Sequence, residues 1–196
     1  MSDLTTQLDE ARRRWDTLRH PFYQRWERGE LRREDIAFYS GQYRHAVVAL
    51  AELAAKGGDG EHAREERSHI ALWDDFVAAC GGVPAEPLPE TRELVAAFAA
   101  AAPGAEADAV LYAIEAAQPP VSETKLEGLV GHYGFAPDDA GTAYFRVHAE
   151  LDKQHAAEAA DRLAGANGGS DGALARAESA LAANWRLLDG VERVLA

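Results

Sequence analysis

The sequence predicts an all-α protein, on three observations. Apolar residues recur every three or four positions through most of the chain, as in the stripe formed by Ile36, Tyr39 and Tyr43. Alanine, which has the highest helix propensity, is abundant, and no stretch shows the alternating pattern of a strand flanked by hairpin turns. Because 196 residues suffice for one domain of ordinary size, we expect residues 1–196 to form a single helical domain.

Proline and glycine divide the first half of the chain into four predicted helices. The first covers residues 4–18 and ends before His20-Pro21, since the residue preceding a proline disfavours the α conformation. A short helix over residues 22–28 is closed by Gly29. The next two, over residues 32–56 and 61–79, each end at a glycine pair, Gly57-Gly58 and Gly81-Gly82.

The second half is divided in the same way. Pro84, Pro87 and Pro89 predict a linker, and Pro119-Pro120 predicts a kink. A glycine-rich stretch over residues 165–170 predicts a flexible connection. The helices expected between these breaks cover residues 91–101, 105–117, 123–133, 140–164 and 173–195.

Charge and cysteine content narrow the class of protein. Acidic residues outnumber basic ones by 33 to 20, a net charge of −13, which opposes nonspecific binding to nucleic acids and anionic membranes. The single cysteine, Cys80, excludes an intrachain disulfide and is typical of a reducing compartment. The sequence shows neither a signal peptide nor an apolar run long enough to span a bilayer. We therefore expect a cytoplasmic protein with no nucleic-acid or membrane partner.

Histidine and aspartate occur at helical spacing in residues 144–155. At about 100° per residue, His148, Asp152 and His155 fall within about a 60° sector of one helix face. Leu151 shares that side, so the three polar side chains are expected to face the core, where a metal ion would satisfy them. A surface helix with scattered polar residues is the alternative.

A second candidate segment lies in the predicted helix over residues 61–79. Glu65 and Glu66 stand four and three residues before His69, and Glu-x-x-His is the repeated unit of helical di-iron carboxylate sites. Either glutamate could instead be a solvated surface charge, so the choice between them stays open. The nearby His62 is expected at the surface.

A third segment supplies one more carboxylate. Glu115 lies in an almost entirely apolar stretch over residues 110–117, where a carboxylate is costly unless it is paired or bound to metal. A salt bridge to Lys125 is the alternative account of this glutamate.

Together the three segments offer three carboxylates and three imidazoles. This donor set suits two iron or manganese ions and differs from a closed structural zinc site, which has four ligands, often thiolates. Three ionised carboxylates would offset three of the four positive charges of two divalent ions. The sequence therefore predicts a di-metal centre for oxygen chemistry, with metal-assisted hydrolysis as the alternative.

Four segments, in this order along the chain, resemble the haem-oxygenase-like di-metal oxidases. They are residues 20–31, which begin His-Pro-Phe-Tyr, then 65–73, 111–134 and 144–155. The resemblance covers nearly the whole chain, and the pattern is most similar to the CADD-type para-aminobenzoate synthases, with PqqC, TenA and UndA-type fatty-acid decarboxylases as wider relatives. It implies a seven-helix bundle around a di-iron or iron–manganese centre with O2 as co-substrate, and it is compatible with a homodimer.

The resemblance also implies roles for individual residues. In the para-aminobenzoate branch a tyrosine of the protein itself is consumed as substrate and a lysine donates nitrogen. The matching residues are Tyr23 and Lys125, with Tyr144 near the metal. Alternatively, Tyr23 packs in the core and Lys125 pairs with Glu115. The implied metal ligands are Glu65 or Glu66, His69, Glu115 as the bridging carboxylate, His148, Asp152 and His155.

We accordingly expect a di-metal oxidase that uses O2 to oxidise a small amine, amino-acid or fatty-acid-like substrate, with self-sacrificing para-aminobenzoate synthesis as one branch. Two alternatives share the fold: a cofactor-independent enzyme of the PqqC or TenA kind, and a metal-free protein that binds small molecules. A TenA-type thiaminase needs a nucleophilic cysteine, for which Cys80 at a predicted helix end is a poor candidate. The complete ligand set favours the oxidase.

Overall fold

The structure is a computed structural model that describes residues 3–83, 85–165 and 170–196. All regular structure in these residues is helical, which confirms the all-α prediction. Pro84 of the predicted proline linker and residues 166–169 of the predicted glycine-rich connection lie outside the described residues. The helices are α1 (Leu4–Arg14), η1 (Thr17–Arg19), α2 (Pro21–Glu27), α3 (Arg33–Ala54), α4 (His62–Cys80), α5 (Pro89–Ala99), α6 (Ala105–Glu115), α7 (Gln118–Gly131), η2 (Ala140–Thr142), α8 (Ala143–Gly165) and α9 (Ser170–Leu195).

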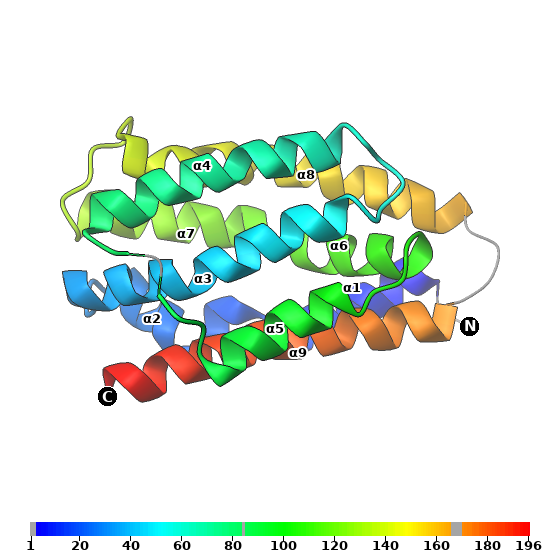
Figure 1. The fold of residues 1–196 in the computed structure, drawn as a ribbon, viewed down its shortest axis with the longest axis horizontal. Coiled ribbons are helices and arrows are strands. Elements are labelled where there is room, and N and C mark those ends of the chain that lie inside the picture. The colour runs from blue at the N-terminus through cyan, green and yellow to red at the C-terminus, as the bar shows by residue number, and fades with distance from the viewer. Residues whose placement is uncertain (1–2, 84, 166–169) are drawn as a thin grey trace.

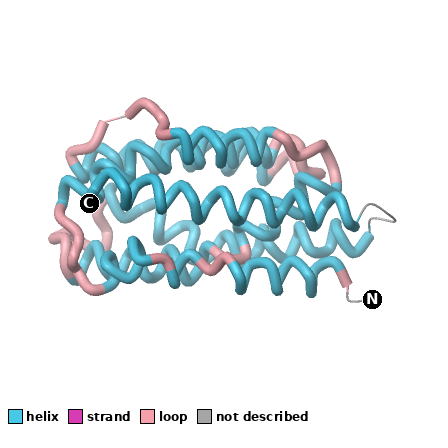
Figure 2. Tube along the Cα trace, turned by 90° about the horizontal axis from the view of Figure 1, so that it is seen from below, coloured by secondary structure: helices cyan, strands magenta, loops and turns pink. Residues whose placement is uncertain are grey.

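The long helices run along a common axis and form an elongated bundle (Figures 1 and 2). Helix α3 packs along α4, α8 packs against both α6 and α7, and α9 packs against α5 and α6. Helix α4 also contacts α8, so the two helices that carry most of the predicted donors are neighbours. Within the described residues no helix combines the length and the hydropathy needed to cross a membrane.

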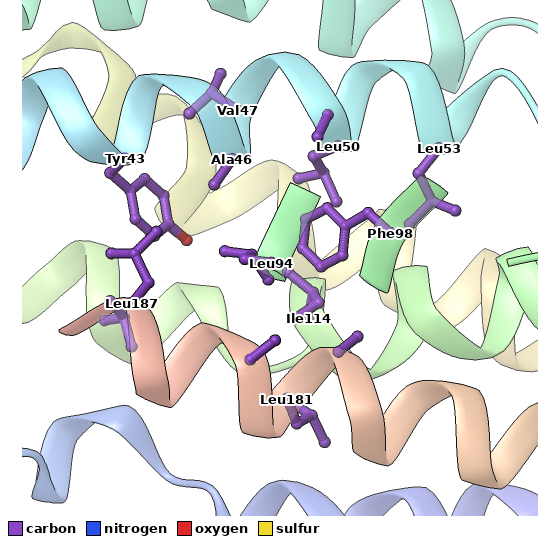
Figure 3. Packing of buried hydrophobic residues seen from close by; sticks show 14 of the residues in the cluster. Tyr43, Ala46, Val47, Leu50, Leu53, Leu94, Phe98, Ile114, Leu181 and Leu187 are labelled. Atoms are coloured by element: carbon purple, nitrogen blue, oxygen red, sulfur yellow. The ribbon is translucent and has the colours of Figure 1, made fainter. Parts of the chain in front are cut away.

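An apolar layer fills the space between α3, α5, α6 and α9. Tyr43 and Leu50 of α3 face Phe98 of α5 and Ile114 of α6, with Leu181 of α9 on the opposite side (Figure 3). All five side chains are buried, with exposed fractions of 7% or less. Burial of each large apolar side chain stabilises the fold by about 1.5–3 kcal/mol, and this packing holds α3 against α6.

The helix count differs from the seven implied by family resemblance, because nine α-helices are present in the described residues. Two prolines explain the additional breaks. Pro21 and Pro119 each lie in the first turn of a new helix, where a backbone N–H has no intrahelical acceptor, so proline begins a helix there. Helix α7 therefore starts at Gln118, five residues before the predicted helix over 123–133, and Glu115 becomes the last residue of α6.

Candidate metal centre

Seven polar side chains from α4, α6 and α8 meet in the interior of the bundle. On α4 they are spaced at i, i+4 and i+7, and on α8 they have the same spacing, so each set occupies one face of its helix. Each of the seven is no more than 5% exposed. They are His62, Glu66 and His69 of α4, Glu115 of α6, and His148, Asp152 and His155 of α8.

The burial pattern distinguishes the two glutamates and corrects the expectation for His62. Of the glutamate pair, Glu66 is buried at 1% exposure, whereas the side chain of Glu65 is 42% exposed. The expectation that His62 lies at the surface was wrong, because it is only 2% exposed. Its spacing from Glu66 and His69 was the available signal, since a residue four positions before a buried one shares its helix face.

Glu66 lies at the centre of the cluster. Its Oε1 is 3.1 Å from Nδ1 of His69, 3.9 Å from Nε2 of His148, 3.9 Å from Nδ1 of His155 and 4.0 Å from Nε2 of His62. Two groups of donors share this carboxylate, one with His62 and His155 and one with His69 and His148. Within each group the donor atoms lie within 4.8 Å of one another.

Hydrogen bonds from outside the cluster determine the tautomers of two histidines. Nδ1 of His148 lies 2.8 Å from the backbone carbonyl of Tyr144, and a carbonyl only accepts, so Nδ1 carries the hydrogen. Nε2 of His148 therefore presents a lone pair toward Glu66.

His155 is oriented in the same way by a carboxylate. Its Nε2 donates to Oε2 of Glu65 at 2.9 Å, which leaves the lone pair on Nδ1. That atom lies 3.9 Å from Oδ1 of Asp152 and 3.9 Å from Oε1 of Glu66. A carboxylate behind a histidine is the usual arrangement that orients a metal ligand, and Glu65 has this position outside the cluster, whereas Glu66 lies inside it.

Several atoms of the cluster are buried with no hydrogen-bond partner. Several unpartnered polar atoms in one buried cluster are costly, since buried polar groups are normally paired. Divalent cations would satisfy these atoms together, and nitrogen and carboxylate oxygen are their ordinary ligands. The residues present therefore fit a metal cofactor. The unpartnered atoms are Nε2 of His62, Oε2 of Glu66, both carboxylate oxygens of Glu115, Nε2 of His148, Oδ2 of Asp152 and Nδ1 of His155.

The pKa values of the cluster show that its buried carboxylates lack neighbouring positive charges. Burial raises the pKa of Glu115 well above its usual value, and the charge of Glu66 adds to the effect. Burial, together with the charges of Glu115 and Glu66, also raises the pKa of Asp152 well above its usual value. Burial lowers the pKa of His148 to about 4, so this imidazole is neutral near pH 7. Burial also acts to raise the pKa of Glu66, but the hydrogen bond from His69 and the neighbouring histidines outweigh it and lower that pKa.

Lys125 of α7 is buried among aromatic rings. Its Nζ lies 5.0–5.6 Å from five ring centroids, and the residue is 2% exposed. Burial lowers the pKa of Lys125 to about 7. No ion pair joins Lys125 to Glu115 in the described part of the chain, so the salt bridge considered from the sequence is absent. The five rings are those of Tyr23, Tyr39, Tyr43, Trp73 and Phe145.

A row of rings connects this aromatic cage to the metal-binding cluster. The ring centroid of Tyr23 lies 5.1 Å from Nζ of Lys125, and the Tyr23 hydroxyl is hydrogen-bonded to that of Tyr39 at 2.8 Å. At the other end, Tyr144 stacks on His148 with centroids 3.8 Å apart and contacts Trp73 at 4.7 Å. The three predicted pocket residues are thus all buried near the cluster, with Tyr144 in direct contact with it.

The pockets that reach these residues are small. One lined by Tyr43, Ile114, Tyr144 and His148 holds about 10 Å³, and another that reaches Tyr23 and Tyr43 holds about 20 Å³. A single water needs at least about 10–15 Å³. Each pocket therefore has space for little more than one water molecule.

The fold and the cluster together define an iron-containing redox enzyme, and the chain belongs to that family, which it matches over residues 47–189. It is an oxidoreductase with a metal cofactor, and the resemblance to the haem-oxygenase-like oxidases is confirmed. Among curated proteins it is 33% identical to a 4-aminobenzoate synthase of Chlamydia muridarum, over 78% of this chain and 74% of that protein. It is 31% identical to a 4-aminobenzoate synthase of Nitrosomonas europaea, over 89% of this chain and 85% of that protein.

Solved structures confirm the fold. A domain of unknown function with a haem-oxygenase-like fold from Shewanella denitrificans superposes with a TM-score of 0.78 at 22% identity, covering 100% of this chain and 94% of that one. A TenA homologue from Pseudomonas syringae also has a TM-score of 0.78, at 19% identity, covering 97% of this chain and 91% of that one.

Proposed function

We propose that the protein is a di-metal oxidase that makes 4-aminobenzoate from its own Tyr23 and Lys125. Two irons, or one iron and one manganese, would supply the reduction of O2 when bound. Glu66 is the carboxylate common to both donor groups, so we assign the bridging role to it in place of Glu115. The proposed ligands are Glu66, His69, Glu115, His148, Asp152 and His155.

The observation that carries this proposal is that the side chains of Tyr23 and Lys125 lie together beside the candidate metal centre. Lys125 lies over the ring of Tyr23 in a buried cage, and the adjoining pockets hold only about 10 and 20 Å³. The relatives named 4-aminobenzoate synthase support the same reaction. An enzyme that oxidises a free amine or fatty acid beside Tyr144 would need a larger cavity than these two pockets provide.

The residues around Tyr23 and Lys125 hold these two side chains in place and favour the neutral form of the lysine. With a pKa of about 7, Lys125 is about half neutral at that pH, and only the neutral amine has the lone pair needed to transfer nitrogen. The hydroxyl of Tyr39 holds the phenol of Tyr23. Lys125 and Tyr23 are only 2% and 3% exposed, and this burial excludes water from the reacting groups.

Isotope labelling tests the proposal. Protein made with ring-labelled tyrosine and ε-¹⁵N lysine, loaded with ferrous iron and exposed to O2, should release 4-aminobenzoate that carries both labels. The yield should not exceed one product per chain, because each chain holds one Tyr23 and one Lys125. Tyr23→Phe and Lys125→Met should release none while binding the same amount of metal as the unsubstituted protein.

Tyr112→Phe is a matched control, since Tyr112 is hydrogen-bonded to Asp9 outside the cage. This variant should form as much product as the unsubstituted protein. Unlabelled product, or many products per chain, would show that an external substrate is used. Metal content well below two ions per chain, or full metal retention by His148→Ala and Asp152→Ala, would contradict the proposed centre.

The two alternatives considered from the sequence do not explain the buried carboxylates or the state of Cys80. A metal-free binding protein or a cofactor-independent enzyme leaves the mutually facing acceptors of Glu66, Glu115 and Asp152 without a counter-charge. Cys80 is buried and its pKa is raised to about 12 by that burial, so it is not an activated nucleophile.

A further inference from the structure

His62 is a buried histidine at the start of α4 that the proposed ligand set does not use. Its Nε2 lies 2.8 Å from Oε1 of Glu115, and its ring lies 4.1 Å from that of His155 between centroids. The side chain is 2% exposed. It therefore lies inside the cluster, in contact with Glu115 of α6 and His155 of α8.

The contact with Glu115 is close, but it is not a hydrogen bond. Nε2 of His62 and both oxygens of Glu115 have no hydrogen-bond partner, although two of these atoms are 2.8 Å apart. Nδ1 of His155 is also unpartnered. Buried atoms of α4, α6 and α8 that have no hydrogen-bond partner thus lie in the same part of the interior.

The distances fit a common cation. With metal–nitrogen and metal–oxygen bonds of about 2.0–2.2 Å, two ligands of one ion lie at most about 4.4 Å apart. Nε2 of His62 is 2.8 Å from Glu115 and 4.0 Å from Oε1 of Glu66, and Nδ1 of His155 is 3.9 Å from that same oxygen. His62, Glu66 and His155 form one of the two donor groups of the cluster.

Local structure holds His62 in this position and connects it to a polar pocket. Oδ1 of Asp59 accepts hydrogen bonds from the backbone N–H groups of Glu61 and His62, at 2.8 and 3.2 Å, which fixes the first turn of α4. A pocket of about 190 Å³ is lined by His62 and His155 and by four carboxylates, which attract divalent cations. The carboxylates are those of Asp59, Glu61, Glu65 and Glu158.

We propose that His62 is a seventh protein ligand, which binds the second metal ion together with Glu66, Glu115 and His155, and that this ion enters through the acidic pocket. The inference rests on the proposed di-metal centre. It deepens that proposal, because imidazole favours iron whereas carboxylate and water favour manganese. With His62 each ion has two imidazoles, so both positions select iron over manganese.

Metal content tests the ligand role. His62→Gln replaces the imidazole with a poor metal ligand that still carries side-chain N–H groups, whereas His62→Glu supplies a metal ligand that has no N–H group. After anaerobic ferrous loading and desalting, the unsubstituted protein and His132→Gln, an exposed histidine outside the cluster, should retain two ions per chain. His62→Gln should retain one. His62→Glu should retain two, with one imidazole fewer per pair of ions in iron X-ray absorption.

Competition tests the selectivity. In equimolar ferrous and manganous ions, the unsubstituted protein and His132→Gln should retain mostly iron. His62→Glu should show at least a tenfold higher ratio of bound manganese to iron. An unchanged ratio would overturn the inferred iron preference.

The outcomes separate this inference from the proposed function. Two ions bound to His62→Gln with the affinity of the unsubstituted protein would mean that His62 serves only as a hydrogen-bonding neighbour, and would overturn the ligand assignment alone. An iron X-ray absorption spectrum of His62→Glu identical to that of the unsubstituted protein would also overturn the ligand assignment. This measurement requires only that His62→Glu folds. Fewer than two ions in the unsubstituted protein would overturn both proposals, whereas two ions without 4-aminobenzoate would overturn only the reaction.

Discussion

At the scale of single residues, adjacent glutamates have different roles because consecutive positions on a helix differ by about 100°. Glu66 faces α8 and lies among four imidazoles, whereas Glu65 lies at the edge of the cluster and accepts a hydrogen bond from His155. We therefore expect Glu66 to bind both ions and Glu65 only to orient one of their ligands.

Substitution of the two glutamates should separate these roles. Glu66→Gln should lose both ions, because both donor groups depend on this carboxylate. Glu65→Ala should retain two ions with an affinity about 10–100-fold weaker, the usual cost of removing the partner of a ligating histidine. Titration with ferrous iron against a competing chelator measures both. Equal losses in the two variants would contradict the distinction.

Lys125 should make stability depend on pH. Burial lowers its pKa to about 7, whereas an unfolded lysine titrates near pH 10.4. Between these values the unfolded chain binds more protons, so stability rises with pH across this window, and the full cost of the buried ammonium is present below pH 7.

Lys125→Met removes this charge and should stabilise the metal-free protein. The gain should be roughly 2–5 kcal/mol at pH 6, since each pKa unit corresponds to about 1.4 kcal/mol and the surrounding rings return part of the cost. It should shrink steadily between pH 7 and pH 10. Urea unfolding at several pH values measures the difference between the two proteins, and a gain independent of pH would refute the explanation.

At the scale of elements, the packing of α7 on α2 determines where Lys125 lies. The indole N–H of Trp26 in α2 donates to the backbone carbonyl of Lys125 at 3.2 Å. Gly128, one turn further along α7, permits this close approach, because a Cβ there would lie 2.6 Å from two atoms of the Trp26 ring.

Gly128→Ala should therefore destabilise the protein by about 1–3 kcal/mol, the usual cost of overpacking a core. Gly131→Ala is the matched control, since a Cβ at the end of the same helix meets nothing within 4 Å. That variant should be unchanged or slightly more stable. Denaturant unfolding of both variants checks the prediction, and equal effects would contradict the role of Gly128.

At the scale of the whole molecule, the candidate centre joins helices that are distant in the sequence. Its side chains come from α4, α6 and α8, and removal of the ions would leave buried carboxylates of Glu66, Glu115 and Asp152 without their counter-charges. Bound metal should therefore stabilise the entire bundle.

A chelator should lower the melting temperature. Two sites, each at a metal concentration 100 times its dissociation constant, contribute about 5 kcal/mol together. For a chain of this size that corresponds to about 10–20 °C. His148→Ala should respond much less to the chelator than the unsubstituted protein. Calorimetry with and without chelator provides the measurement, and an unchanged melting temperature would count against a metal-stabilised bundle.

The amino-acid sequence by itself determined the helices and the helix faces. Helical periodicity and turn residues are local properties, so they predicted the all-α fold and the inward face of His148, Asp152 and His155. Only the tertiary structure decided which polar residues on neighbouring helices meet. It selected Glu66 over Glu65, buried His62, and surrounded Lys125 with rings instead of pairing it with Glu115. These outcomes depend on contacts between helices, which the spacing within any one helix does not specify.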